Sequence, residues 1–256
     1  MPIYELSTFS NASLDVPSHL HALNVPSGTF TQFSPVSFAA TVGWYNINAQ
    51  GTLEGKNVKG TNKIGIRQTG GLEIIALAPG NYSAAEAATA LQTALQASAL
   101  TDAGNFTVVY NSITKKFTIS HSDVFTVEAA SSLVSEKEYR PLQVMMGFPL
   151  AGSASSASSQ TSARPCDMRS IRELRVKFST VHNITNDIST PGEDNYVFAV
   201  TPLVAFGSMF SVDLTPNGVT DFPEHGLNNI KVSVVDENNE PILFETGGWR
   251  VSFSVE

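Results

Sequence analysis

The chain has 256 residues, a hydrophobic content of 42% and a formal net charge of −8. This length and apolar content allow one large all-β domain or two smaller units, and they exclude disorder of the whole chain. The negative charge argues against broad electrostatic binding of nucleic acid. Charged residues make up only 15% of the chain, below the usual quarter. Their replacement by Ser, Thr, Asn and Gly is common in strand-and-turn proteins and on surfaces buried in large assemblies.

The sequence shows no signal for export, membrane insertion or disulfide formation. Residues 1–8 lack a basic region followed by an apolar region, so we expect no signal peptide. No segment approaches the roughly 20 consecutive apolar residues of a membrane span. The single cysteine, Cys166, excludes an intrachain disulfide.

Residues 1–34 are mostly polar and contain the spaced prolines Pro17 and Pro26. We expect an extended arm with little structure of its own, because it has too little apolar surface to fold alone. Its apolar side chains would anchor it on neighbouring molecules. The predicted anchors are Ile3, Tyr4, Leu6, Phe9, Leu14, Leu20 and Leu23.

Residues 35–78 carry the period-2 alternation of strands that bury one face. Apolar residues alternate with others from Pro35 to Trp44, and shorter apolar runs follow at 64–68 and 72–77. We assign 35–78 to the first part of a β-sandwich.

The period changes after Pro79-Gly80. Ser83 and Glu86 form a capping box, and apolar residues then recur every three to four positions, which predicts a helix over 83–99. Three short strands are predicted beyond it, at 106–110, 116–120 and 124–127, with a helical turn within 133–146. We interpret 79–150 as a compact α+β insertion made of a helix and a hairpin.

Residues 151–164 are rich in Ser and Ala and read as a linker. Strands return over 165–256, at 171–181, 196–206 and 209–214, and the chain ends in two alternating strands around a turn at 236–241. The predicted fold class is all-β: a single jelly-roll β-sandwich, built from 35–78 and 165–256, with a small α+β insertion.

The sequence contains no established catalytic, phosphate-binding or metal-binding motif. Two groups of residues could offer metal ligands. His19 and His21 would share one face of an extended arm, and we interpret them as solvated histidines. Asp236, Asn238 and Glu240 could offer oxygen atoms, and we interpret them as part of a plain hairpin turn. Cys166 lies beside Arg164 and Arg169, which could lower its pKa, but we expect an unreactive thiol. We predict no enzyme activity, no cofactor and no metal.

One basic cluster stands out in the sequence: Arg164, Arg169, Arg172, Arg175 and Lys177. A solvated or interface face is the default interpretation, and contact with packaged nucleic acid is the alternative.

Two segments resemble capsid proteins of icosahedral double-stranded DNA viruses with jelly-roll capsids, above all the penton or minor capsid proteins of virophages, polinton-like viruses and giant viruses. One segment is the terminal pair of strands with its acidic turn, 230–255. The other begins with Pro79-Gly-Asn-Tyr-Ser83, continues through the helix and the hairpin at 110–119, and closes at Met146-Gly-Phe148. Together they cover a little under half of the chain.

The resemblance implies a viral capsid protein located in the virion and made in the host cytoplasm or a viral factory. It implies a homopentamer that closes the five-fold vertices and contacts neighbouring capsid proteins such as a major capsid protein. The outward-facing insertion could meet a host receptor or a spike, and no specific nucleic-acid binding is expected. The alternative is a receptor- or glycan-binding spike or fibre head of a virion.

Overall fold

A computed structural model describes residues 3–7, 20–24, 32–48, 51–53, 56–58, 60–129, 141–153, 155–180, 196–202, 206–214, 220–221, 229–237, 239, 242, 244 and 247–255. The chain forms two compact units. The sandwich unit comprises residues 1–44, 52–58 and 171–256, and the insertion unit comprises 45–51 and 59–170.

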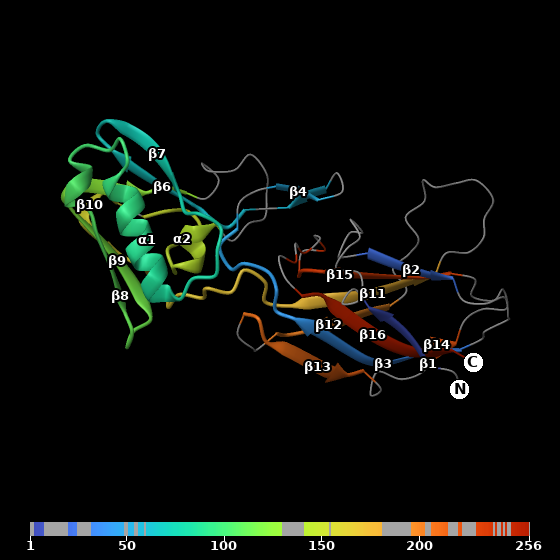
Figure 1. The fold of residues 1–256 in the computed structure, drawn as a ribbon. Helices are drawn as coiled ribbons and strands as arrows, with labels where there is room; N and C mark the ends of the chain where they lie inside the picture. The colour runs from blue at the N-terminus through green and yellow to red at the C-terminus, as the bar shows by residue number, and fades with distance from the viewer. Residues whose placement is uncertain are drawn as a thin grey trace. The chain divides into compact units, whose positions relative to one another are not determined.

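The first sheet of the sandwich unit joins the two ends of the chain. Its order is β1 (Ile3–Ser7), β16 (Trp249–Val255), β3 (Gln32–Thr41) and β13 (Met209–Asp213), and the short β14 (Thr220–Asp221) also pairs with β3. All pairs are antiparallel. The last strand therefore lies inside the sheet, between β1 and β3 (Figure 1).

The second sheet has the order β12 (Tyr196–Val200), β11 (Leu174–Thr180), β15 (Asn229–Val235) and β2 (Leu20–Asn24), again antiparallel. Leaving out β14 and the separate hairpin of β4 (Gly51–Leu53) and β5 (Lys56–Val58), the two sheets of the sandwich unit contain eight of the described strands, which we number 1 to 8 in chain order. In that numbering the two sheets read 1-8-3-6 and 5-4-7-2. This is the strand order of a jelly roll, so the predicted fold class is confirmed.

The two sheets share one hydrophobic core, as the alternation in the sequence predicts. Phe38, Val251 and Phe253 contribute from the first sheet, and Val176 and Val232 from the second; all five are fully buried. Each alternate residue along these strands points into the space between the sheets, which is how a period-2 sequence forms a sandwich.

The insertion unit has a separate core and a separate sheet. Its order is β10 (Ala157–Thr161), β9 (Lys116–Val127), β6 (Lys63–Gln68) and β7 (Gly71–Ala76), with β8 (Thr107–Asn111) also paired with β9. Helix α1 (Ala84–Gln96) lies across one face of this sheet (Figure 1). Its buried residues Ala87, Ala88, Leu91 and Leu95 pack into the same core as Phe117 and Ile119 of β9.

Helix α1 begins where the sequence predicts. The Ser83 hydroxyl accepts a hydrogen bond from the Glu86 backbone N–H, and the Glu86 carboxylate accepts one from the Ser83 N–H, so the predicted capping box is present. Hydrogen bonding of the Glu86 carboxylate with the Ser83 side chain, and with the Ser83 backbone N–H, lowers the pKa of Glu86. The short helices η1 (Ala103–Asn105) and α2 (Leu142–Met145) follow. Among the described residues, no helix combines the length and the apolar character needed to cross a membrane.

The structure moves two predicted boundaries. Strands β6 and β7 lie in the insertion unit, so the sandwich does not continue to residue 78 as predicted. The segment predicted as a linker, 151–164, contains β10, which pairs with β9. Both differences have one cause, since the pairings of β6 and of β10 with β9 join strands that lie far apart in the sequence, and local composition does not report such pairing.

Gly147 is the middle residue of the Met-Gly-Phe segment near the end of the insertion, and its surroundings show why glycine stands there. Its φ is +89°, and a Cβ atom placed there would lie 2.1 Å from the backbone oxygen of Arg164. Real Cβ atoms do not approach a carbonyl oxygen so closely, and positive φ is costly for residues other than glycine. This position therefore requires glycine.

We expect Phe253→Asp to abolish cooperative folding of the sandwich unit. Phe253 is fully buried, and burying an unpaired carboxylate costs several kcal/mol in order-of-magnitude terms. Thermal unfolding followed by near-ultraviolet circular dichroism measures this. The matched control is Ser211→Asp, at an exposed position of β13, which should change stability by less than about 0.5 kcal/mol. Equal stability of the two variants would contradict the proposed core.

We expect Gly147→Ala to destabilise the insertion unit by about 2 kcal/mol or more, because the backbone at this position is both left-handed and crowded. Gly104→Ala is the control, since nothing lies within 4 Å of its added Cβ atom and its φ is not positive. Urea unfolding curves should separate the two variants. A Gly147→Ala protein as stable as the Gly104→Ala protein would show that the close contact with Arg164 is not present.

Candidate functional site

Five of the seven predicted anchor residues lie on strands of the sandwich. Ile3, Tyr4 and Leu6 lie on β1, and their backbones pair with Ser254, Phe253 and Val251 of β16. Leu20 and Leu23 lie on β2, where they pair with Ser233 and Ile230. The prediction of an extended arm is therefore wrong for 3–7 and 20–24. Phe9 and Leu14 lie outside the described residues.

The predicted basic cluster is divided between the two units. Arg164 and Arg169 belong to the insertion unit, and Arg172, Arg175 and Lys177 belong to the sandwich unit. The Arg169 Nε atom lies 2.9 Å from Asp167 Oδ1, and Arg175 Nε lies 2.8 Å from Glu173 Oε1. Two of the guanidinium groups thus have a neighbouring carboxylate as counter-ion. The interpretation of the cluster as a solvated or interface face stays a prediction.

Cys166 has the character of an unreactive thiol. Burial raises its pKa, against the smaller opposing effects of a hydrogen bond with Tyr110 and the charge of Lys115. Burial and the neighbouring Cys166 likewise raise the pKa of Tyr110. A raised pKa keeps the sulfur in the less nucleophilic thiol form at neutral pH. The suggestion from the sequence that Arg164 and Arg169 lower this pKa is wrong.

The other candidate ligands from the sequence do not form a described metal site. Asp236 begins a turn in which its carbonyl oxygen accepts a hydrogen bond from the Asn239 N–H at 3.0 Å. Asn238, Glu240 and His19 lie outside the described residues, and only the backbone of His21 is described. Within the described ranges, no three His, Cys, Asp or Glu side chains are close enough to hold a metal ion.

One face of the insertion sheet is buried under α1, and the other carries polar side chains. Hydroxyl groups pair across β9 and β10: Ser120 with Ser159, and Thr118 with Thr161, each at 3.0 Å between oxygens. Val109 of β8 is opposite Thr118 and 58% exposed. This face therefore combines hydroxyl groups with an exposed apolar side chain.

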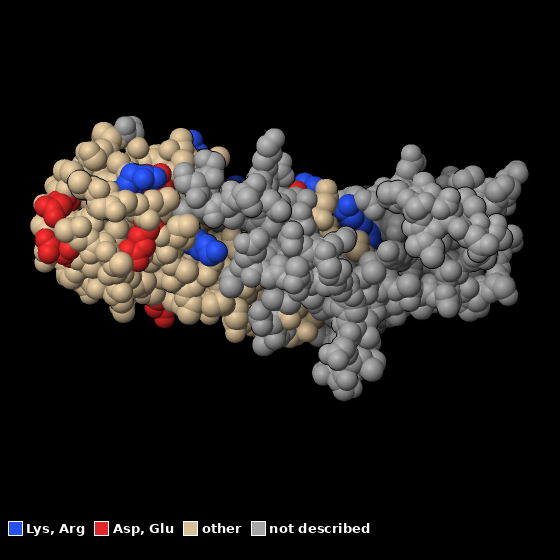
Figure 2. Space-filling view, turned by 90° about the horizontal axis from the view of Figure 1, so that it is seen from above, with Lys and Arg blue, Asp and Glu red and all other residues tan. Residues whose placement is uncertain are grey.

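An ion pair joins β6 of the same sheet to the residue that follows β9. Arg67 Nε donates to Glu128 Oε1 at 2.7 Å, and this hydrogen bond lowers the pKa of Glu128. In Figure 2, the charged groups on the insertion unit form small separate patches of both signs among larger uncharged areas. Such a face offers little to a partner that recognises charge alone.

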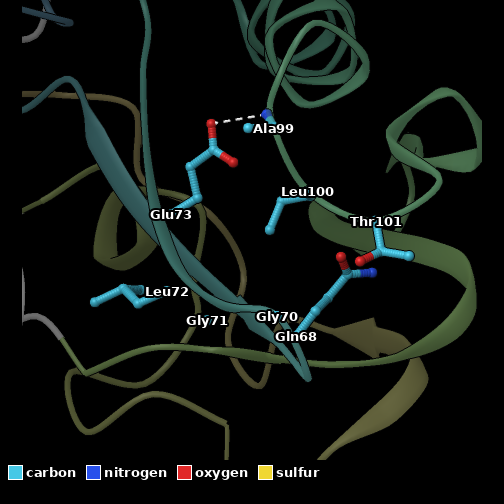
Figure 3. Close-up of a pocket in the computed structure, with 8 residues that line it drawn as sticks. All are labelled: Gln68, Gly70, Gly71, Leu72, Glu73, Ala99, Leu100 and Thr101. Carbon is cyan, nitrogen blue, oxygen red and sulfur yellow. Dashed lines mark hydrogen bonds between the residues drawn. The ribbon is translucent and has the colours of Figure 1, made fainter.

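A pocket of about 320 Å³ opens between the β6–β7 hairpin and the segment that follows α1 (Figure 3). Gln68, Gly70, Gly71, Leu72 and Glu73 line it from the hairpin. Ala99, Leu100 and Thr101 line it from the other side. In Figure 3, Glu73 lies at one end, Gln68 and Thr101 lie at the other end, and Leu100 lies between them.

The carboxylate of Glu73 is held in place by the backbone after α1. Its Oε1 atom accepts a hydrogen bond from the Ala99 N–H at 3.0 Å. The second oxygen of Glu73 and the hydroxyl group of Thr101 have no hydrogen-bond partner among the described residues. The pocket therefore offers free polar atoms at both of its ends.

Gln68 is oriented by the buried ring of His121. The Asp102 carbonyl oxygen can only accept, so His121 Nε2, at 2.9 Å from it, carries the hydrogen. Nδ1 is then the acceptor, and it receives the Asp123 N–H at 2.9 Å and the Gln68 side-chain amide nitrogen at 3.2 Å. Phe106 stacks on the ring with 4.2 Å between centroids. This arrangement fixes which end of the Gln68 amide is nitrogen.

The remaining oxygen of the Gln68 amide has no partner. Oε1 is buried and makes no hydrogen bond with the described residues, and the whole side chain is 92% buried, with 8% exposed. Leaving a buried acceptor unpaired costs about 1–3 kcal/mol. None of Gln68, Glu73 and Thr101 stood out in the sequence. Only the Gly70-Gly71 turn between two strands was a visible local signal.

Comparison with known proteins finds similarity among solved structures. No family model matches the chain, and no curated protein sequence matches it. A crystal structure of the mavirus penton protein is similar, with 12% sequence identity and a TM-score of 0.48, covering 99% of this chain and 98% of that chain. Values this low do not assign a fold or a function, and the jelly roll of this chain follows from its own strand order.

We expect deletion of residues 1–28 to destabilise the sandwich unit, because it removes one edge strand from each sheet and leaves β16 and β15 each without one partner. This replaces the expectation from the sequence, which placed residues 1–34 outside the sandwich as an arm. Thermal unfolding measures the effect, and a protein lacking residues 1–2 alone is the control. An unchanged unfolding temperature after deletion of 1–28 would contradict the pairing of β1 and β2.

Proposed function

We propose that this protein is a structural subunit of a virus capsid and that it forms the penton, a homopentamer at the five-fold vertices of an icosahedral double-stranded DNA virus. The observation that carries the proposal is the jelly-roll strand order of the sandwich unit. Jelly rolls occur in viral capsid proteins, lectin domains and cupins, so the fold alone leaves several classes open. The sequence resemblance favours the first of them.

The two resembling segments fall one in each unit of the fold. Residues 230–255 include β15 and β16, the strands that hold inner positions in their sheets. Residues 79–148 contain α1, β8, β9 and α2, which form most of the insertion unit. An insertion that folds as a unit of its own can vary in sequence while the sandwich stays constant.

The chemistry of the chain suits contacts with copies of itself and with other capsid proteins, such as a major capsid protein. Its low charge favours broad interfaces with polar rims over networks of salt bridges. The hydroxyl-lined sheet face of the insertion unit, with exposed Val109, is one such surface. Phe9 and Leu14, between β1 and β2, remain the proposed anchors on neighbouring subunits.

The mass of the assembly tests this proposal. Native mass spectrometry of the full chain should give five times the subunit mass of 27.4 kDa, and negative-stain electron microscopy should show five-fold rings. The pentamer should persist in about 1 M NaCl, where the Debye length falls to about 3 Å, because few charges hold it together. A trimer would instead favour a spike or fibre head. A monomer at high micromolar concentration would contradict both assignments.

A further inference from the structure

The pocket of the insertion unit has the properties of a site for a small polar ligand. At about 320 Å³, it lies at the lower end of the range of ligand pockets, about 300–1,000 Å³. All of its walls come from one folded unit, so the site does not depend on oligomerisation or on the proposed role in a capsid.

The polar atoms that this pocket offers are mainly hydrogen-bond acceptors. Glu73 has one carboxylate oxygen beyond the one that accepts from Ala99, and the buried Gln68 Oε1 has no partner. The Thr101 hydroxyl group can donate or accept. The ligand must therefore supply several donors.

The spacing of these groups separates the candidate ligands. A single ammonium group or metal ion needs its acceptors around one point, but Glu73 lies at the opposite end of the pocket from Gln68 and Thr101 (Figure 3). A ligand with donors distributed over its length fits this arrangement. The carboxylate of Glu73 also disfavours an anion.

The side chains between the polar ends are apolar. Leu100 lies between Glu73 and Gln68 in Figure 3, and Leu72 lines another part of the pocket. Both side chains are partly exposed. A ring that carries hydroxyl groups on its edge and C–H groups on its faces matches acceptors at both ends and apolar walls between them.

We propose that this pocket binds one ring of a neutral saccharide. In this assignment, Glu73 and Gln68 accept hydrogen bonds from sugar hydroxyl groups, Thr101 exchanges a hydrogen bond with a third hydroxyl, and Leu100 contacts the C–H face. The His121 network positions Gln68 so that its oxygen, and not its nitrogen, is the available atom.

Saturation-transfer-difference NMR on the full chain tests the assignment. The probes are glucose, galactose, mannose and N-acetylglucosamine, with N-acetylneuraminic acid as the anionic sugar and methylamine as the ammonium probe. We expect saturable binding of at least one neutral sugar and weaker binding of the two charged probes. Absence of saturable binding by every neutral sugar, or tighter binding of a charged probe, would overturn the proposal.

Two variants link the binding to the pocket. Glu73→Gln replaces the free acceptor by a donor but keeps an oxygen for the Ala99 N–H, and Thr101→Val removes the hydroxyl group. Each should weaken sugar binding about tenfold, the effect of one lost hydrogen bond.

The matched controls are Glu237→Gln, in the sandwich unit, and Thr114→Val, in the exposed turn between β8 and β9. Both should bind as the unmodified chain does. Thermal unfolding of all four variants checks that each is folded. Folded Glu73→Gln and Thr101→Val proteins with unchanged sugar affinity would place the binding elsewhere and overturn the assignment.

Discussion

The pairing of the two chain ends in one sheet is the constraint on which the sandwich depends. β16 lies between β1 and β3, so both neighbours of the last strand come from the start of the chain. Its residues Trp249, Val251 and Phe253 are fully buried and provide the centre of the core. Pairing over such a sequence distance closes a very long loop, whose entropic cost the buried apolar surface must offset.

The insertion unit occupies one long connection of the sandwich. The unit lies in the connection between β3 and β11, which belong to different sheets. A connection of this length is tolerated because loop-closure entropy rises only slowly with length. The unit also has its own core, so its stability does not have to come from the sandwich.

Short backbone contacts fix the start of the insertion. The Asn46 side chain makes two hydrogen bonds with the backbone of Tyr82. Its amide nitrogen donates to the Tyr82 carbonyl oxygen at 2.7 Å, and its amide oxygen accepts from the Tyr82 N–H at 2.9 Å. Ile47 and Gly80 form a two-bond bridge beside it. These contacts place the Pro-Gly-Asn-Tyr-Ser segment in front of α1, and they give that sequence pattern a physical role at the entry to the helix.

The sequence by itself determined the elements whose signals are local. The alternation in 35–44, 230–234 and 249–255 specified strands with one buried face, and the Ser83 capping box with its helical period specified α1. Only the tertiary structure decided which strands share a sheet. β1, β2 and β10 carry no sustained apolar alternation, and their partners lie far away along the chain. The pocket was equally invisible, because Gln68, Glu73 and Thr101 come together only when the β6–β7 hairpin packs beside the end of α1. Strand pairing and pocket geometry are relations between distant residues, and no local propensity encodes them.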